Sequence, residues 1–469
     1  MSDSKQELLR NLPSVTELLK SETVAGWLRQ QPLPLVTECL RRALAGLRQQ
    51  VLDDTAGRCG ARHITADAVL GRANELLQHA VEPRVREAIN ATGIILHTGL
   101  GRAVFPETVV DSIIPGLKGC VNLAVDRESG ERLERDELIE PLLTELTGAE
   151  AATVVNNNAG ATLLALAALA AAREVIVSRG QLIEIGGSFR LPEVMAQSGA
   201  KLVEVGATNR THLRDYQRAI SDQTAAIMRV HPSNYRVIGF TSEVGLLEMA
   251  ELAHRHGLLL IDDLGAGALV DLAQFGLPHE PTVRESIEAG ADVVLFSADK
   301  LIGAGQGGIL AGRKEAIARI RKHPLMRALR VDKTCIMVLE RTLHLFRDPE
   351  LLRRSHPTYR MMSTPMEALK ARAEKLVAAA AGAVPAAAVE IVEGAAYLGS
   401  GSLPTEALPS LVVTVALPGM GASELARRLR LDDACVFGRI EADRVRLDVR
   451  TITDEQVSAI ATALGRIAG

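Results

Sequence analysis

The sequence is poor in aromatic residues and has no hydrophobic run that could cross a membrane. Phe, Trp and Tyr make up 3% of its 469 residues, and this scarcity disfavours base stacking as the main way of binding a nucleic acid. The longest stretch of low polarity, residues 159–172, is too short and too rich in alanine for a membrane span. The first residues contain no apolar signal core. We therefore expect a cytoplasmic protein with no membrane partner.

Paired cysteines and an excess of positive charge are also missing. The five cysteines are scattered, with no C-x-x-C pair and no metal-ligand spacing, so we expect reduced thiols and no metal site. The net charge is −4, so contact with a nucleic acid would need a local basic patch. Residues 1–80, with ten Lys and Arg against nine Asp and Glu, do not supply an obvious one.

The N-terminal region, residues 1–80, has the pattern of a small helical domain. Ser14–Glu17 is a capping box that starts a helix. Further helical patterns cover residues 35–52 and residues 65–81, with Thr65 as the N-cap of the second. The residues between them, 53–62, are predicted to form a loop.

Two more domains are expected after it. Residues 81–345 alternate short β-branched strands with helices rich in alanine and leucine, which is typical of a parallel sheet covered by helices. Residues 346–469 form a smaller α+β domain after a charged helical linker. The ligand site is expected in the loops after the carboxyl ends of the parallel strands. The predicted strands are 152–155, 174–177, 201–205, 225–230, 258–261 and 293–296 in the larger domain, and 389–392, 411–415 and 445–449 in the smaller one.

Lys300 follows the last of these parallel strands and precedes the glycine-rich stretch 303–308. A partly desolvated lysine has a lowered pKa and can react as a free amine with an aldehyde cofactor such as pyridoxal phosphate. Ser297, three residues earlier, could donate a hydrogen bond to the cofactor phosphate from the same turn. The S-x-x-K pattern alone is weak, because it also occurs by chance and at serine nucleophiles.

A polar turn of small residues follows the first of these strands. Asn157, Asn158, Ala159 and Gly160 stand between this strand and the start of a helix. Free backbone N–H groups at a helix start, together with the positive end of the helix dipole, bind phosphate. Asn and Gly are also ordinary turn residues, so the turn supports a cofactor site only together with Lys300.

Two adjacent carboxylates, Asp262 and Asp263, end another predicted strand, before Lys300 in the sequence. A carboxylate facing the pyridine nitrogen of pyridoxal phosphate keeps the ring protonated, and the protonated ring is the electron sink of the cofactor. Alternation along a strand can point only one of the two inward, and we assign this role to Asp262. Such an aspartate can equally be a helix N-cap or a metal ligand.

A basic run follows the glycine-rich stretch. Residues 313–333 hold eight Lys and Arg against two acidic residues. Arg327 and Arg330 would share one face of a helix and could bind one oxyanion together. A third candidate, Arg102, ends the glycine turn at residues 99–101. Many charge runs are only solvated faces, and a turn this rich in glycine can exist for backbone geometry alone.

Taken together, these residues resemble the bacterial selenocysteine synthase family, the L-seryl-tRNA(Sec) selenium transferases, over nearly the whole chain. The blocks VSRGQLIEIGGSFR and VGATNRTHL are unlike those of general pyridoxal phosphate enzymes. The other matching blocks are LPSVTELL, INATGIILHTGLGRA, VNNNAGATLLALAALA, HPSNYRVIGF, IDDLGAGALVDL, FSADKLIGAGQGGILAGRK, SGSLPTEALPS and GRIEADRVRLDVRT.

The resemblance implies an α/β fold of the aspartate-aminotransferase type (fold type I), with an added N-terminal domain that engages tRNA. It implies that Lys300 holds pyridoxal phosphate, that Asp299 assists catalysis, and that Arg102, Arg327 and Arg330 bind the phosphate of the selenium donor. The implied reaction replaces the hydroxyl of seryl-tRNA(Sec) with selenium from selenophosphate, by elimination of water and addition of selenium. The implied assembly is a homo-oligomer, a ring of dimers.

Three positions depart from the family pattern, and one other enzyme class competes with it. Ala298 stands where glycine is usual, Gly305 where proline is usual, and Gly99 where asparagine is common. The competing class is a related pyridoxal phosphate lyase that acts on a free small amino compound. Such a lyase would be expected to lack the N-terminal domain that residues 1–80 form here. A tRNA-binding scaffold without catalysis is disfavoured by the presence of Lys300.

Overall fold

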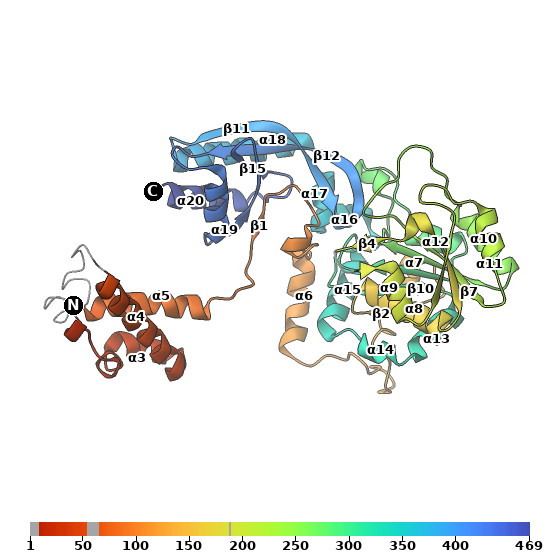
Figure 1. Cartoon of the computed structure of the whole chain (residues 1–469), viewed down its shortest axis with the longest axis horizontal. Helices are drawn as coiled ribbons and strands as arrows, with labels where there is room; N and C mark the ends of the chain where they lie inside the picture. Colours follow the sequence, from red (N-terminus) through yellow and green to blue (C-terminus); the bar gives the residue numbers. More distant parts are fainter. Residues whose placement is uncertain (1–8, 54–64, 187–188) are drawn as a thin grey trace. The chain divides into compact units, whose positions relative to one another are not determined.

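The computed structural model describes residues 9–53, 65–186 and 189–469. The chain divides into two compact units, Met1–Glu87 and Ala88–Gly469, whose elements are labelled in Figure 1. The sequence-based boundaries at residues 80 and 345 stay predictions. None of the helices in the described ranges is long and apolar enough to cross a bilayer.

The first unit is helical, as predicted. The Ser14 side chain accepts from the backbone N–H of Glu17, and the Glu17 carboxylate accepts from the backbone N–H of Ser14 at 2.8 Å, which completes the capping box. Thr65 caps its helix through the backbone N–H of Ala68. Only Asp53 of the predicted loop lies within the described residues, and it is helical. The helices are α2 (Val15–Leu18), α3 (Glu22–Leu28), α4 (Leu33–Asp53) and α5 (Ala66–Val81), packed around a core that includes Val36, Leu40, Ala43, Ala73 and Leu77.

The second unit is built on a seven-stranded sheet. Its strands, in spatial order, are β2 (Ala151–Val155), β10 (Gly308–Gly312), β9 (Val293–Ser297), β8 (Leu259–Gly265), β7 (Thr224–Val230), β3 (Glu174–Ser178) and β6 (Lys201–Val205). All six strands predicted for this region are present. Both faces of the central strands are buried, because each strand is a nearly continuous apolar run.

The prediction of a purely parallel sheet was wrong for one strand. β10 runs antiparallel to both β9 and β2; it begins at the last residue of the glycine-rich stretch 303–308, and no strand was predicted there. Glycine is required there, since a Cβ on Gly308 would lie 2.2 Å from the carbonyl oxygen of Asn157 and one on Gly312 would lie 2.1 Å from that of Asp292. β10 therefore closes the Lys300 loop, with Gly308 opposite Ser297.

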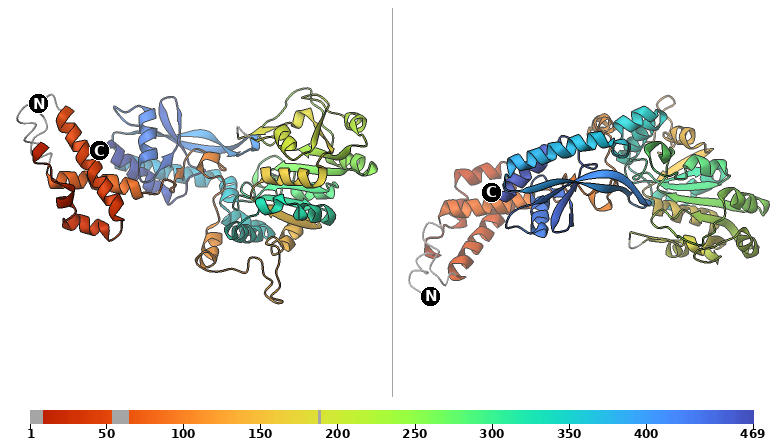
Figure 2. Two further views of the ribbon diagram at one scale, coloured as in Figure 1. Left: turned by 60° about the horizontal axis from the view of Figure 1, so that its bottom comes forward. Right: turned by 90° about the horizontal axis from the view of Figure 1, so that it is seen from above.

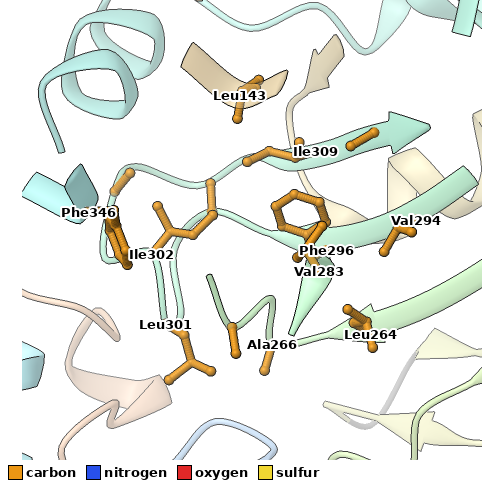
Figure 3. Close-up of a cluster of buried hydrophobic side chains, with 14 of the residues drawn as sticks. Leu143, Leu264, Ala266, Val283, Val294, Phe296, Leu301, Ile302, Ile309 and Phe346 are labelled. Atoms are coloured by element: carbon orange, nitrogen blue, oxygen red, sulfur yellow. The ribbon is translucent and has the colours of Figure 1, made fainter. Parts of the chain in front are cut away.

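Helices cover the two faces of this sheet. The residues of α8, α9 and α13 pack with one set of alternate strand residues, such as Ile261 and Leu295. The residues of α6, α7, α11, α12 and α15 pack with the other set, such as Leu260 and Val294. Figure 3 shows part of this second cluster, with Ile302 between Phe346 and Phe296 and Leu301 beside Ala266. The bounds are α6 (Glu107–Lys118), α7 (Glu140–Thr147), α8 (Asn158–Ala170), α9 (Leu191–Gln197), α10 (Leu213–Ala219), α11 (Leu246–Arg255), α12 (Val283–Glu288), α13 (Lys314–Lys322), α14 (Leu325–Ala328) and α15 (Lys333–His344).

The C-terminal region forms an antiparallel sheet, in the order β11-β12-β15-β14, packed on helices. The three strands predicted here are present, and two of them are much longer than expected, since β11 (Ala388–Gly399) and β12 (Ser402–Ala416) pair as a long hairpin (Figure 2). The other strands are β14 (Arg439–Glu441) and β15 (Arg444–Asp448), and the helices are α16 (Pro349–Ser355), α17 (Pro357–Ser363), α18 (Met366–Ala383), α19 (Ala422–Leu431) and α20 (Gln456–Ala468). The short pieces are β1 (Ile89–Asn90) with β13 (Val436–Phe437), β4 (Glu184–Ile185) with β5 (Phe189–Arg190), and the 3₁₀ turns Thr98–Leu100, Arg179–Gln181, Leu272–Phe275 and Leu345–Arg347.

Candidate active site around Lys300

Lys300 lies in a cavity of about 320 Å³ at the carboxyl ends of the parallel strands. The residue is 5% exposed. Burial and, after it, the positive charge of Arg102 lower the pKa of Lys300 below its usual range, although Asp299 and Asp263 oppose this. The amine is thus suited to react uncharged. The cavity is lined by Arg102, Asn157, Asn158, Ala159, Ile183, Ile185, Gly186, Phe189, Val230, His231, Ser233, Asp263, Gly265, Ser297, Lys300 and Gln306.

The predicted phosphate turn is at this cavity, with one residue set back. Asn157, Asn158 and Ala159 line it at the N-terminus of α8, and Ser297 lines it at the end of β9. Gly160 does not, because its backbone N–H donates to the Asn157 side chain at 2.7 Å inside the first turn of the helix. The contact of Gly160 with the cofactor stays a prediction.

The inward-facing aspartate is Asp263, and the prediction of Asp262 was wrong. Only one of the two faces the cavity, as alternation requires, but Asp263 shares its face of β8 with Ile261, the face that packs on α8. Asp262 points to the opposite face. There it pairs with Arg229, its neighbour in register on β7, at 2.9 Å between Nε and Oδ1.

Asp263 is held by donors on the neighbouring helix. Asn158 Nδ2 donates to Oδ1 and Thr162 Oγ1 donates to Oδ2, each at 2.9 Å, and the backbone N–H of Gly265 donates at 3.1 Å. Burial nevertheless raises the pKa of Asp263, an effect that these hydrogen bonds reduce. A cationic group bound in the cavity would compensate the charge of a buried carboxylate held in this way.

Arg102 reaches the same cavity and is paired with the residue before Lys300. Its Nη1 lies 2.6 Å from Oδ2 of Asp299. Arg102 has a left-handed backbone, with φ of 66°, which is uncommon for a residue with a side chain and is frequent at functional sites. The backbone N–H of Arg102 donates to the carbonyl of His97 at 3.0 Å and fixes this turn.

Arg327 and Arg330 do not join Arg102 in the same chain. They line a second cavity of about 280 Å³ together with Arg135. The neighbouring charge of Arg135, followed by burial and the charge of Arg327, lowers the pKa of Arg330. Among the described residues neither Arg327 nor Arg330 has an ion-pair partner, and their role in binding an anion stays a prediction. The expectation that all three arginines meet is not fulfilled within one subunit.

Sequence comparison identifies the family of the chain. The family profile described as "L-seryl-tRNA selenium transferase" matches residues 88–453, and a second one, "Selenocysteine synthase N terminal", matches residues 9–48. The chain belongs to the L-seryl-tRNA selenium transferase family. It is 46% identical to the L-seryl-tRNA(Sec) selenium transferase of Methylocella silvestris over 97% of each chain. It is 44% identical to that of Geotalea daltonii, over 97% of this chain and 98% of the relative.

The fold of this selenium transferase family member is of the predicted type. A solved structure of D-glucosaminate-6-phosphate ammonia-lyase superposes with a TM-score of 0.57 at 21% identity, covering 82% of this chain and 96% of that one. At this identity the likeness concerns the fold alone. With the family match, it confirms a fold type I architecture of the aspartate-aminotransferase type.

The residues around Lys300 fit pyridoxal phosphate, the cofactor of selenium transferases. The site offers a buried amine for the aldehyde, a helix N-terminus with Ser297 for the phosphate, and a carboxylate at Asp263 for the ring nitrogen. The hydroxyl of Ser233 is buried at the cavity without a partner among the described residues, as expected where a polar ligand is to be bound.

Several cavity residues of this selenium transferase were missed at the sequence level. His231 and Ser233 follow β7 directly, and a polar residue after a parallel strand was the available signal. Phe189 lies in a short strand pair that no pattern indicated. The departure at Ala298 is accommodated, because this residue is fully buried and its backbone N–H donates to the carbonyl of Gly307 at 2.8 Å.

Proposed function

We propose that this protein converts seryl-tRNA(Sec) to selenocysteinyl-tRNA(Sec), with selenophosphate as the selenium donor. The observation that carries this proposal is the similarity to L-seryl-tRNA(Sec) selenium transferases along almost the whole chain, together with a buried, low-pKa lysine in a cavity that fits their cofactor. The reaction would take place in the cytoplasm, where aminoacyl-tRNA is made and used.

The cavity residues have separable tasks. Lys300 holds the cofactor and, once its amine is free, takes the proton from Cα of the seryl group. Asp263 keeps the ring nitrogen protonated, while Asn157, Ala159 and Ser297 hold the phosphate. Bound pyridoxal phosphate supplies the electron sink that makes the Cα proton acidic and allows the β-hydroxyl to leave. Asp299 orients Arg102 beside the reacting carbon through their 2.6 Å ion pair.

The donor phosphate would be bound by Arg102 of one subunit and by Arg327 and Arg330 of a neighbouring subunit. The two arginines lie in a separate cavity of their own chain, and β2, whose end bridges to Arg330, is the edge strand of the sheet. α6 also exposes an apolar row, with Val110 and Ile114 each 38% exposed, which a second copy would cover. A homo-oligomer, as in the predicted ring of dimers, would therefore complete the site.

The N-terminal unit, with its predicted domain at residues 1–80, would engage the tRNA. The support is the family match at residues 9–48, which is separate from the match over the catalytic region. Because the substrate carboxylate is an ester, no arginine is needed to bind it, and the arginines remain available for the donor.

A direct test follows product formation. The purified holoenzyme is incubated with seryl-tRNA(Sec) and radiolabelled selenophosphate, and the aminoacyl group is analysed. We expect selenocysteinyl-tRNA from wild type and none from Lys300→Ala. The alternative, a lyase on a free amino compound, is favoured only by the fold likeness. Turnover of free amino acids without any selenocysteinyl-tRNA would overturn the proposal and favour this lyase.

The shared site has its own test by mixing two inactive variants. Lys300→Ala lacks the cofactor lysine, and the double variant Arg327→Ala with Arg330→Ala lacks the donor arginines. If the site is shared, co-expressed subunits form some sites with all three residues and recover part of the activity. Each variant alone stays inactive, and a mixture that is no more active than the separate variants would place the whole site in one chain.

A further inference from the structure

His231 and Glu280 form a pair at the Lys300 cavity that has no role in the scheme above. Nε2 of His231 lies 3.0 Å from Oε1 of Glu280. His231 lines the cavity, and its side chain is 20% exposed, whereas that of Glu280 is 6% exposed. A buried carboxylate behind a partly exposed histidine is the arrangement that orients an imidazole for proton transfer.

The position of His231 is fixed from two directions. It is the first residue after β7, and its backbone N–H donates to the carbonyl of Asp263 at 2.8 Å. Glu280 approaches from the segment between β8 and α12, and among the described residues His231 is its one ion-pair partner. The pair therefore joins the end of β7, which is hydrogen-bonded to Asp263 of β8, to a separate loop.

The contact with Glu280 sets the donor atoms of the ring. Since the carboxylate accepts at Nε2, this nitrogen carries a hydrogen, and Nδ1 is the ring atom left to exchange a proton with another group. The one hydrogen bond that the described residues make with the His231 ring is this contact at Nε2. A proton on Nδ1 is thus available to a group bound in the cavity.

We propose that His231 donates a proton to the departing β-hydroxyl of the seryl group and that Glu280 is its positioning residue; this inference rests on the proposed function. Lys300 first takes the Cα proton and leaves the electrons of that C–H bond on the substrate. In a second step, these electrons form the Cα–Cβ double bond. The Cβ–O bond breaks with its electron pair on oxygen, which takes the Nδ1 proton and leaves as water. His231 is left neutral, with Glu280 still accepting from Nε2.

The other polar groups of the cavity are less suited to this step. Lys300 is already assigned to the Cα proton in the scheme above. Asp299 is engaged by Arg102, and Asp263 is surrounded by donors from α8. His231 is the cavity residue whose ring is oriented by a buried carboxylate of its own.

The test separates proton removal at Cα from loss of the hydroxyl. The holoenzymes of wild type, His231→Gln and Glu280→Gln are compared with His279→Gln, a neighbouring histidine that is 52% exposed. Cofactor content is measured by absorbance, exchange of the seryl Cα proton with solvent deuterium is followed, and selenocysteinyl-tRNA formation is timed. A tRNA charged with β-chloroalanine serves as a second substrate, because chloride leaves without a proton.

We expect His231→Gln to bind cofactor and exchange the Cα proton as wild type does, and to form selenocysteinyl-tRNA about 10²–10⁴-fold more slowly. Glu280→Gln should show a smaller loss of the same kind, His279→Gln none, and β-chloroalanyl-tRNA should restore the rate of both affected variants. Parallel loss of exchange and product, loss of cofactor, or no rescue by β-chloroalanine would overturn the inference. If wild type itself forms no selenocysteinyl-tRNA, the proposed function fails instead.

Discussion

Asp262 and Asp263 offer a matched pair of substitutions, because they are adjacent in the chain and face opposite sides of β8. We expect Asp263→Asn to slow selenocysteinyl-tRNA formation by about 10²–10³-fold, the usual loss when one fixed electrostatic group is removed from an active site. Cofactor affinity should fall by about 10–100-fold, since a hydrogen bond to a charged group contributes about 1.5–3 kcal/mol.

For stability the order should be reversed: Asp262→Asn should lower the free energy of unfolding much more than Asp263→Asn. Burial raises the pKa of Asp263, so its charge opposes folding of the apoenzyme, and Asp263→Asn should change the free energy of unfolding by less than about 1 kcal/mol. Asp262→Asn leaves Arg229 unpaired. Breaking a buried ion pair costs about 3–5 kcal/mol, and the value here should lie at the lower end because the Arg229 side chain keeps 15% exposure.

The assays are denaturant unfolding of both apoenzymes, cofactor titration, and single-turnover formation of selenocysteinyl-tRNA with saturating cofactor. Asp262→Asn should react at close to the wild-type rate per folded, loaded subunit. The reasoning would be refuted if Asp262→Asn lost activity at wild-type stability while Asp263→Asn kept it.

Three further outcomes follow from the surroundings of Lys300. Arg102→Gln should raise the pKa of Lys300 by removing a repelling charge, so the pH profile for cofactor attachment to the apoenzyme should move to higher pH; an unchanged profile would contradict this. Burial lowers the pKa of His356 from 6.5 to about 4. His356 therefore contributes up to about 3 kcal/mol to the free energy of unfolding above pH 6.5, and this contribution is lost as the pH falls toward 4. The free energy of unfolding of His356→Gln should lack this acid-sensitive part. Gly303→Ala should cost more than about 2 kcal/mol in unfolding free energy, since Gly303 has φ of 73° and its added Cβ would lie 2.1 Å from Nε2 of His356; Gly276→Ala, with φ of 80° and open space around it, should cost much less.

Much of the catalytic region could be predicted from local patterns. The strands were found because each is a short apolar run that is buried on both faces, and Lys300, Ser297 and Asn157–Ala159 were found because they stand directly at strand or helix ends. These patterns involve only a few neighbouring residues, so they do not depend on contacts between distant segments.

What failed depended on contacts between distant segments. Arg229 on β7 and the donors on α8 decide which of Asp262 and Asp263 faces the cavity. Neither contact can be predicted from the sequence of the strand itself. The strand β10 was not predicted, because its two glycines are residues typical of turns. They are needed here for close packing against distant backbone. The separation of Arg102 from Arg327 and Arg330 could not be predicted, because spacing along a chain does not show which cavity a side chain enters.

The antiparallel return of β10 has a consequence for how the enzyme is loaded. Gly308 lies against the backbone of Asn157 and opposite Ser297, so the lysine loop and the helix end that would bind phosphate share one rigid support. The apoenzyme is then preorganised, and little ordering entropy opposes binding of the cofactor. Pyridoxal phosphate would be captured by a cradle that folding has already completed, and its removal should leave amide hydrogen exchange in β9 and β10 nearly as slow as in the holoenzyme.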